Sequence, residues 1–549
     1  MILADGQEAA PDAYAWETLS RLPLADAALA LWSFVLQPSF LDGVFQRHRG
    51  RSFEEVLTFP LFVDLIGDAL LHYDGSGRQS FQRAQEQGRL PTTSETVYSK
   101  LRHVPLSLSL GFFEEATQRL APLLPATAAA VSLPQSLEGF TVVVGDGKTL
   151  KRVAKRLLPA RGVAGKILGG KLLVAFLPAR GLAVALAADP DGEANDCRLV
   201  PQLLQRARPL IAGPRLWVFD RQFCDLIQTE RLTQQDDHFL IRYHPKAHFH
   251  PDPTRPARRT ADTQGRAVVE EWGWLGGAGN PRRRYVRRIT LLRPGEEVVI
   301  LVTDLLDAAA IPAADLLAVY LARWGIERVF QQVTEVFSLR RLIGSTPQAT
   351  VFQAAFCLLL YNMVQVVRGH IAAAQPAPCP VESLSAEQIF GDVQRELISV
   401  STLLPAAMVA KLYVEELTAE RVRARLQQRL GAVWSERWRK ASPKKNRAPG
   451  KKAKQAGAHT SVHRLVESGR LQQRGNKGQN KRIVFTAVGY HPRPVGEAKR
   501  GRPAGRCPSR RSAASGGVFP DGFAKDDLEE ADPRRRQVQL LGAASDGLH

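Results

Sequence analysis

The stretch FTVVVGDGKTL, residues 140–150, decides the fold of this chain. Thr141 to Val144 form a β-branched run, which predicts a buried strand, and the run stops at Gly-Asp-Gly. An apolar strand places its last residue at the rim of the sheet, where a ligand has access. Asp146 is therefore a candidate functional carboxylate.

The sequence that follows predicts three more strands and a helix. Residues 167–190 predict two strands joined at Pro178 to Gly181, residues 197–211 a helix, and RLWVFDRQF, residues 215–223, a fourth strand that again ends in an acid, Asp220. If the first and fourth strands are neighbours, the two carboxylates converge. Close carboxylates repel each other unless a cation neutralises them, and oxygen ligands select Mg²⁺ or Mn²⁺. The simpler interpretation is two turn residues, since Asp is common in turns.

A third acid lies in the stretch YLARWGIE, in which Tyr320, Arg323 and Glu327 are at positions i, i+3 and i+7. On one helix these side chains share a face. A phenol, a guanidinium and a carboxylate suit a phosphate clamp beside a metal ligand better than a core. The simpler interpretation is an exposed Arg–Glu pair, worth about 0.3–0.5 kcal/mol.

The remaining sequence predicts an α/β protein with helical flanks. Residues 1–125 read as a helical N-terminal domain, in which the segment 91–105 is either a DNA-recognition helix or an ordinary bundle helix. The core spans 135–370 and contains a mixed sheet. Alternating polar and apolar residues predict an inserted antiparallel β region at about 236–306, and a helical C-terminal region covers 371–440.

Composition and charge restrict the partners. The 549 residues include 74 Lys and Arg against 54 Asp and Glu, a net charge of +20, which favours nucleic acid or an anionic membrane. The longest apolar stretch, 351–367, contains two Gln and one Asn, so we expect a buried helix and no membrane span. The five cysteines have no paired spacing, and no signal peptide is apparent, which indicates a reducing, cytoplasmic compartment.

The positive charge is concentrated near the C-terminus. Residues 441–510 contain 18 Lys and Arg against 2 acidic residues. We therefore expect 441–549 to form a basic, largely disordered tail that neutralises phosphates. Within it, KRGRP, residues 499–503, is similar to the core of an AT-hook, although so short a motif also occurs in ordinary basic tails.

The combination of GDGKTL, FDRQF and YxxRWxIExxF resembles the DDE transposases of bacterial insertion sequences, and its Tyr-Arg-Glu signature resembles the IS-four group. The resemblance spans roughly residues 90 to 370. It implies a ribonuclease H-like core with an inserted β region, and it implies catalytic roles for Asp146, Asp220 and Glu327. These residues would hold two Mg²⁺ ions, with Mn²⁺ able to substitute, for DNA cleavage at the element's ends and strand transfer into target DNA.

The same resemblance implies partners and DNA contacts. The partners are double-stranded DNA, as inverted-repeat ends and as target, and a second copy in a homodimer, in the bacterial cytoplasm at the nucleoid. Trp272 and Trp274 are either candidates for stacking on a flipped base or half-buried strand aromatics. The basic residues that follow the first strand either line the path of the DNA or form a solvated loop. The implied contact residues are Tyr320, Arg323, Arg221, Lys148, Lys151, Arg152, Lys155, Arg156, Trp272 and Trp274.

The sequence departs from the family pattern at one position. The pattern has a Lys seven residues after the Glu, where this chain has Thr334. Either Arg340 or Arg341 supplies the missing charge, or activity is weakened. Two alternatives remain: a metal-dependent nuclease on the same core, and an inactive, DNA-binding remnant of a transposase.

Overall fold

The computed structural model describes residues 11–126, 132–293, 295, 297–323, 325–377, 379–413, 418–440 and 459–475. The chain divides into two compact units. One comprises 1–442 and 446–470, and contains the features below except for the last five residues of one helix, 471–475. The other, 443–445 and 471–549, includes described residues only at 471–475.

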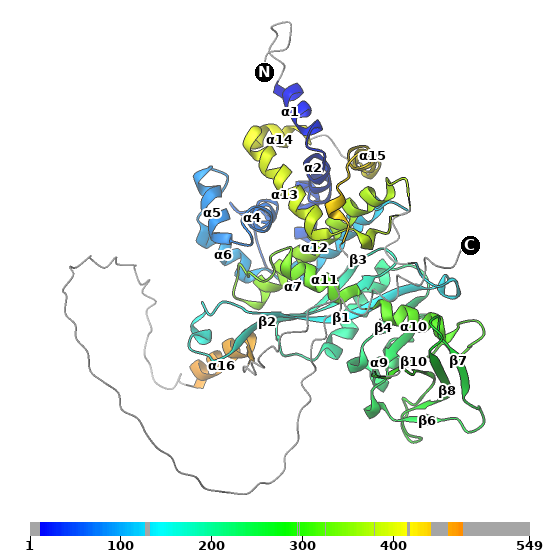
Figure 1. Cartoon of the computed structure of the whole chain (residues 1–549). Helices are drawn as coiled ribbons and strands as arrows, with labels where there is room; N and C mark the ends of the chain where they lie inside the picture. Colours follow the sequence, from blue (N-terminus) through cyan, green and yellow to red (C-terminus); the bar gives the residue numbers. More distant parts are fainter. Residues whose placement is uncertain are drawn as a thin grey trace, which may run out of the picture. The chain divides into compact units, whose positions relative to one another are not determined.

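A large mixed sheet forms the centre of the first unit (Figure 1). Among the described residues it has the order β11-β2-β1-β4-β5-β10-β9-β8-β6, with β3 also pairing with β2 and β7 with β8. The strands are β1 (Thr141–Lys151), β2 (Lys166–Leu177), β3 (Leu182–Asp189), β4 (Arg215–Phe219), β5 (His238–Arg242), β6 (Phe249–Pro251), β7 (Arg258–Ala261), β8 (Ala267–Leu275), β9 (Arg284–Leu291), β10 (Val299–Thr303) and β11 (His459–Ser461). All four predicted core strands are present.

Strand β1 differs from the prediction at its end. It continues through Asp146 to Lys151, because antiparallel pairing with β2 extends beyond the glycines, with Asp146 opposite Val174. Asp146 therefore lies inside a strand and not at its end. The parallel pairing of β1 with β4, by contrast, stops at Val144 opposite Val218. Asp220 directly follows β4, as predicted.

The sheet separates two apolar cores. On β1 and β4, the even-numbered residues Val144 and Val218 pack into the larger core, and the odd-numbered Val143 and Phe219 pack into the smaller one. Helices α10 (Ala313–Ala322), α11 (Gly325–Glu335) and α12 (Pro347–Ala373) contribute to the larger core, and α8 (Val200–Ala207) to the smaller one. Because side chains alternate along a strand, the even-numbered positions of β1 face the larger core and the odd-numbered positions face the smaller one.

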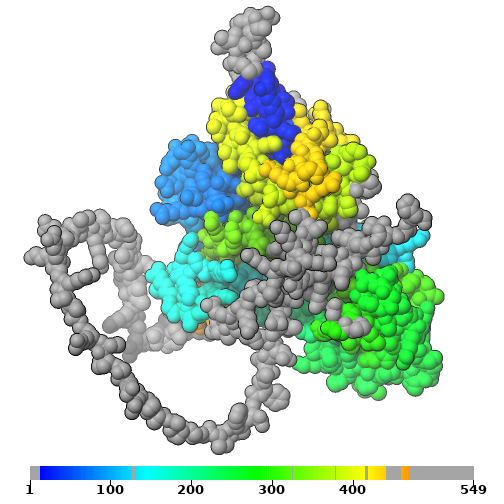
Figure 2. Space-filling view, viewed as in Figure 1, coloured from blue at the N-terminus to red at the C-terminus, as the bar shows by residue number. Residues whose placement is uncertain are grey.

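The helices of the N-terminal and C-terminal regions pack against one another (Figure 2). Asp26 on α2 (Pro23–Val35) is fully buried and accepts hydrogen bonds from the Tyr413 hydroxyl at 2.7 Å and from Arg429 Nε at 2.6 Å. The remaining α-helices are α1 (Pro11–Ser20), α3 (Pro38–His48), α4 (Phe59–Leu71), α5 (Gly77–Glu86), α6 (Ser94–His103), α7 (Leu106–Leu120), α9 (Leu226–Arg231), α13 (Ala386–Leu403), α14 (Ala406–Leu412), α15 (Ala419–Leu430) and α16 (Val462–Gly475).

Helix α12 contains the apolar stretch that the sequence singled out. Among the described residues it is long and apolar enough to cross a membrane by length and composition, and its most apolar window is entirely buried inside the fold. Apolar helices in protein cores have the same composition. The expectation of a buried helix is met.

The region predicted as an inserted antiparallel sheet continues the central sheet. Strand β5 pairs in parallel with β4, and β10 pairs antiparallel with β5. The antiparallel strands β9, β8, β7 and β6 extend outward from β10. The boundary of this outer part therefore falls after β5, because β5 has a core strand on one side.

The described part of the expected basic tail, residues 459–475, has regular structure. Strand β11 pairs in parallel with β2, from His459 opposite Lys166 to Ser461 opposite Leu168. Ser461 N–H donates to Glu193, and Arg464 Nε donates to Asp191 at 2.9 Å. The rest of the expected tail, including residues 499–503, lies outside the described residues.

Comparing two truncations tests the packing of β11. Removal of 476–549 should leave the melting temperature unchanged, whereas removal of 441–549 should lower it by about 1 °C, because strand pairing and a hydrogen-bonded ion pair together contribute about 1 kcal/mol to a unit of this size. The measurement is thermal unfolding followed by circular dichroism. Equal melting temperatures for the two truncations would show that β11 contributes nothing to the stability of the sheet.

Candidate active site

The parallel register of β1 and β4 brings two acids to the same level of the sheet. Asp146 lies two residues beyond Val144, and Asp220 lies two residues beyond its partner Val218. Both have the parity of the residues that face the larger core, where α11 packs. The convergence predicted from the sequence follows from this register.

The third acid lies next to a break between two helices. Helix α10 ends at Ala322 and α11 begins at Gly325. The spacing predicted that Tyr320, Arg323 and Glu327 share one helix, and this prediction is wrong, because the chain leaves the helix at Arg323. Arg323 N–H donates to Tyr320 O at 3.1 Å, and Ile326 N–H donates to Arg323 O at 3.1 Å, which are i to i+3 contacts of a tightened turn. Glu327 lies in the first turn of α11.

The guanidinium of Arg323 lies between two of the acids. Its Nη1 is 3.7 Å from Asp146 Oδ2 and its Nη2 is 3.4 Å from Glu327 Oε1. It also lies 5.7 Å from the centre of the Tyr320 ring. Arg323 is only 4% exposed, whereas the Glu327 side chain is 35% exposed. One buried cation thus joins the strand acid to the helix acid.

The charges of the site affect one another. Burial raises the pKa of Asp146 to about 7; the nearby charges of Glu327 and Asp220 also raise it, and Arg323 opposes the rise. Burial likewise raises the pKa of the Tyr320 phenol to about 12, with Asp220 contributing. Glu327 and Asp220 are therefore each close enough to Asp146 to repel its charge, and a second cation at this site would relieve that repulsion.

The side chains fit a hard divalent cation in their chemistry. Asp146, Asp220 and Glu327 offer carboxylate oxygens, which Mg²⁺ and Mn²⁺ prefer. Within the part of the chain that the structure describes, no three His, Cys, Asp or Glu side chains are gathered closely enough to hold one ion. Arg323 sits between Asp146 and Glu327, so gathering all three acids around an ion requires this guanidinium to move.

The expected phosphate-binding residues differ in their distance from the acids. Lys148 shares the face of Asp146, and its Nζ lies 5.5 Å from the centre of the Phe330 ring on α11. Arg221 directly follows Asp220 and is half-buried. Lys151 and Arg152 lie at and just after the end of β1, and both are exposed. Lys148 thus lies against α11 and Arg221 adjoins Asp220 in the chain, whereas Lys151 and Arg152 lie further along β1.

The two candidate tryptophans on β8 are in different environments. Trp272 is 4% exposed, donates from Nε1 to Leu306 O at 2.9 Å, and carries the Arg255 guanidinium 3.9 Å from its ring centre. In this arrangement it has no face open to a DNA base, which agrees with the alternative of a strand aromatic. Trp274 is half-buried, and Arg283 lies 4.2 Å from its ring centre.

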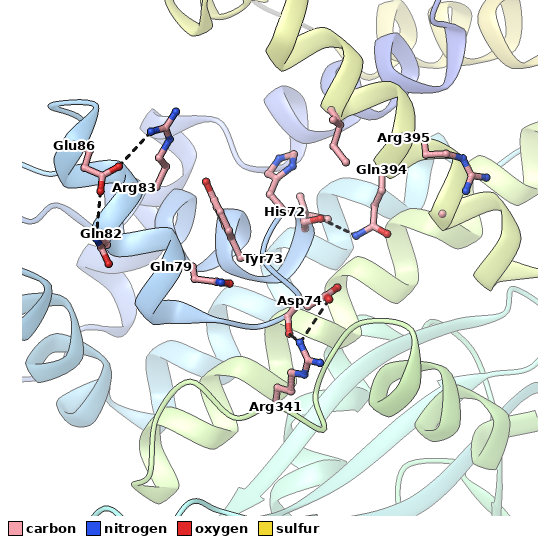
Figure 3. Close-up of a pocket in the computed structure, with 13 residues that line it drawn as sticks. His72, Tyr73, Asp74, Gln79, Gln82, Arg83, Glu86, Arg341, Gln394 and Arg395 are labelled. Carbon is pink, nitrogen blue, oxygen red and sulfur yellow. Dashed lines mark hydrogen bonds and ion pairs between the residues drawn. The ribbon is translucent and has the colours of Figure 1, made fainter. Parts of the chain in front are cut away.

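Thr334 and its possible substitutes are engaged differently: the Arg340 N–H donates to Thr334 O at 3.3 Å, whereas Arg341 binds elsewhere. Thr334 Oγ1 donates to Phe330 O at 2.6 Å on its own helix. Arg341 is exposed and directs its Nη1 to Asp74 Oδ2 at 3.5 Å, in a pocket between α5 and α13 (Figure 3). Arg341 is thus engaged with the N-terminal helices, and Arg340 beside it is exposed.

Three further polar residues, on the opposite face of the sheet from the acids, carry no sequence motif. Asp196 is 6% exposed and accepts a hydrogen bond from Gln222, two residues after Asp220; its carboxylate also pairs with Lys171 on β2. Asp196 precedes a predicted helix, so the sequence suggests a helix cap. No sequence spacing indicates that it reaches the strands of the site.

Residues 142–363 match the family model of the transposase DDE domain. The matched segment contains Asp146, Asp220 and Glu327, and the match supports a DDE transposase. A comparison with curated proteins found no match. Among solved structures, the chain is similar to the piggyBac transposase in a synaptic complex with hairpin DNA, with 9% sequence identity and a TM-score of 0.34 over 77% of this chain and 87% of that one.

Replacement of Asp146 should reveal the unfavourable burial of its charge. The pKa of this carboxyl rises from 3.8 to about 7 on folding. The neutral form is therefore favoured in the fold, and stability is lost as the pH rises between these two values. The free energy of unfolding of Asp146→Asn should match that of wild type near pH 4 and exceed it by about 4 kcal/mol above pH 7. Denaturant unfolding without metal measures this, and a difference that is independent of pH would contradict it.

Proposed function

We propose that this chain is a transposase of the insertion-sequence type, which cuts DNA at the ends of its element and joins the freed 3′-hydroxyl to target DNA. The observation that carries the proposal is the convergence of Asp146 and Asp220 on adjacent strands, with Glu327 beside them, inside the segment that matches the DDE domain. A ribonuclease H-like core and the Tyr-Arg-Glu signature of the IS-four group are part of the same proposal.

In this proposal the three acids are the catalytic residues. Asp146, Asp220 and Glu327 would hold two Mg²⁺ ions, or Mn²⁺ in their place. Bound metal supplies activation of the attacking oxygen and stabilisation of the leaving oxygen. The protein's own contribution is position and charge: rigid strands fix the two aspartates, and the first turn of α11 fixes the glutamate.

Arg323 would have two successive partners. Its guanidinium lies between Asp146 and Glu327. A phosphate oxygen near the scissile bond is a suitable alternative partner, because a guanidinium binds a phosphate as it binds a carboxylate. Tyr320, Lys148 and Arg221 would hold the adjoining phosphates, so positive charge surrounds the DNA while the acids are released for metal binding.

The partners in this proposal are double-stranded DNA and a second copy of the chain. Two ends must be held together for transposition, so we infer a homodimer on DNA, acting in the bacterial cytoplasm at the nucleoid. Lys151 and Arg152 would extend the path of the DNA, and the basic residues 441–510 would add non-specific phosphate contacts. The truncation of 441–549 should therefore also reduce the salt dependence of DNA binding.

Substitution of each acid tests the catalytic assignment. Asp146→Asn, Asp220→Asn and Glu327→Gln should each slow cleavage on the order of 10³-fold, the several kcal/mol that bound metal contributes, and should leave DNA binding intact. The substrate is DNA carrying the inverted repeats that flank the gene, and the assays are gel shift, nicking in Mg²⁺ or EDTA, and strand transfer.

The control for these variants is Asp42→Asn, which alters an exposed acid on α3. It should cut like wild type. Cleavage by Asp146→Asn at the wild-type rate would refute the catalytic assignment. Cleavage without any joining of the 3′ end to target DNA would favour the nuclease alternative.

Thr334→Lys tests the departure from the family pattern. Residue 334 lies two turns after Glu327 on α11, so a lysine there would direct its ammonium toward the same side of the site. The added charge should tighten binding to end DNA by about tenfold, the effect of 1–2 kcal/mol at a partly desolvated phosphate contact, and raise the cleavage rate. Thr334→Gln, which adds length without charge, is the control. Equal affinities for Thr334→Lys and Thr334→Gln would show that no phosphate contact is missing here.

A further inference from the structure

A buried carboxylate lies against the other face of the sheet, opposite the three proposed catalytic acids. Asp196, whose side chain is 8% exposed, begins a short 3₁₀ turn (Asp196–Leu199) between β3 and α8. Its Oδ1 is 2.8 Å from Lys171 Nζ, and its Oδ2 accepts from Gln222 Nε2 at 2.7 Å. Each oxygen therefore binds a different segment of the chain.

The carboxylate of Asp196 also occupies the space beside Gly147. A Cβ atom built on Gly147 would lie 2.5 Å from Asp196 Oδ2, closer than real contacts allow. Gly147 faces the smaller core, whereas its neighbour Asp146 faces α11. A glycine at this position is therefore required for Asp196 to reach the backbone of β1 next to the catalytic acid.

The segment after Asp220 is held twice by the same turn. Gln222 donates from its side chain to Asp196, and its main-chain oxygen accepts from the Cys197 thiol at 3.2 Å. Gln222 is only two residues beyond Asp220, in the 3₁₀ turn Arg221–Phe223. Pairing between β1 and β4 has already ended at Val144 and Val218, so strand hydrogen bonds no longer fix the distance between the two acids.

We propose that Asp196 is a positioning residue that fixes the spacing of Asp146 and Asp220 by linking β1, β2 and the segment after β4. The inference rests on the proposed function, because it gives those two acids a shared task in metal binding. Asp196 acts from the opposite face, through Gly147 and Gln222, and touches neither metal nor DNA. Its charge is balanced by Lys171, so it adds no repulsion to the acids it positions.

The principal test is Asp196→Asn in the full-length protein. Asparagine preserves the size and can still accept from Gln222, but it loses the charge that pairs with Lys171. We expect the Mn²⁺ concentration that half-saturates cleavage to rise at least tenfold, the usual effect of removing an outer partner of metal ligands. Affinity for end DNA without metal should stay within about twofold of wild type, because no DNA contact changes.

The matched control is Asp237→Asn, the same change at a buried, ion-paired acid near the other end of β4. Asp237 is 2% exposed and binds Arg215 and Trp217. Both Asp237→Asn and Asp196→Asn should lower the melting temperature, because each removes a buried ion pair. Asp237→Asn should leave the Mn²⁺ concentration that half-saturates cleavage unchanged. A second readout that needs no cleavage is the rise in melting temperature on adding Mn²⁺, which should shrink in Asp196→Asn alone.

A pair of variants tests the close approach at Gly147. Gly147→Ala should impair Mn²⁺ saturation as Asp196→Asn does, because the new methyl group displaces the carboxylate. In an Asp196→Ala background the same Gly147→Ala change should have a smaller effect, because the group that the methyl meets is gone. Additive effects of these two changes would overturn the proposed linkage.

The outcomes separate this inference from the proposed function. If Asp146→Asn abolishes both cleavage and the Mn²⁺-induced rise in melting temperature while Asp196→Asn saturates like wild type, Asp196 is not a positioning residue and the proposed function stands. If Asp146→Asn preserves both properties, the proposed function itself is wrong, and the positioning role fails with it.

Discussion

The pairing of β1 with β4 is the constraint on which the site depends. These strands are far apart in the sequence and run in parallel, in a register that sets Val144 opposite Val218. A shift of this register by one residue would turn one of the two acids to the opposite face of the sheet. The apolar residues of both strands, which pack into two separate cores, make such a shift costly. Core packing therefore determines where Asp146 and Asp220 meet.

Around these strands the protein tolerates an unfavourable arrangement of charge. Asp146 is partly buried near two other carboxylates, and a single guanidinium offsets part of the repulsion. Such clusters lower the stability of the fold and are typical of sites that receive a cation or a phosphate. The break between α10 and α11 belongs to the same arrangement, because it places Arg323 in a turn from which it contacts both Asp146 and Glu327.

The sequence predicted those parts of the fold that depend on local pattern. The β-branched runs gave the core strands, and the apolar stretch around 351–367 gave the buried helix α12. The helix break at Arg323 was missed, because apolar spacing continues across it from Leu316 to Phe330. The strand β11 and the reach of Asp196 were missed because they depend on contacts between distant segments, which no local period records. The burial of Trp272 likewise depends on Arg255 and on a carbonyl from another strand's end.

The contact between Asp26 and the C-terminal helices has a consequence for the order in which the chain folds during synthesis. Its partners Arg425 and Arg429 follow it by 399 and 403 residues. Helix α2 therefore leaves the ribosome long before the side chains that neutralise its buried acid exist. The apolar face around Asp26 therefore stays exposed, or is bound by a chaperone, until the residues up to α15 have been synthesised and can pack against it. Completion of this helical region thus has to await the synthesis of α15, although the region begins at the N-terminus.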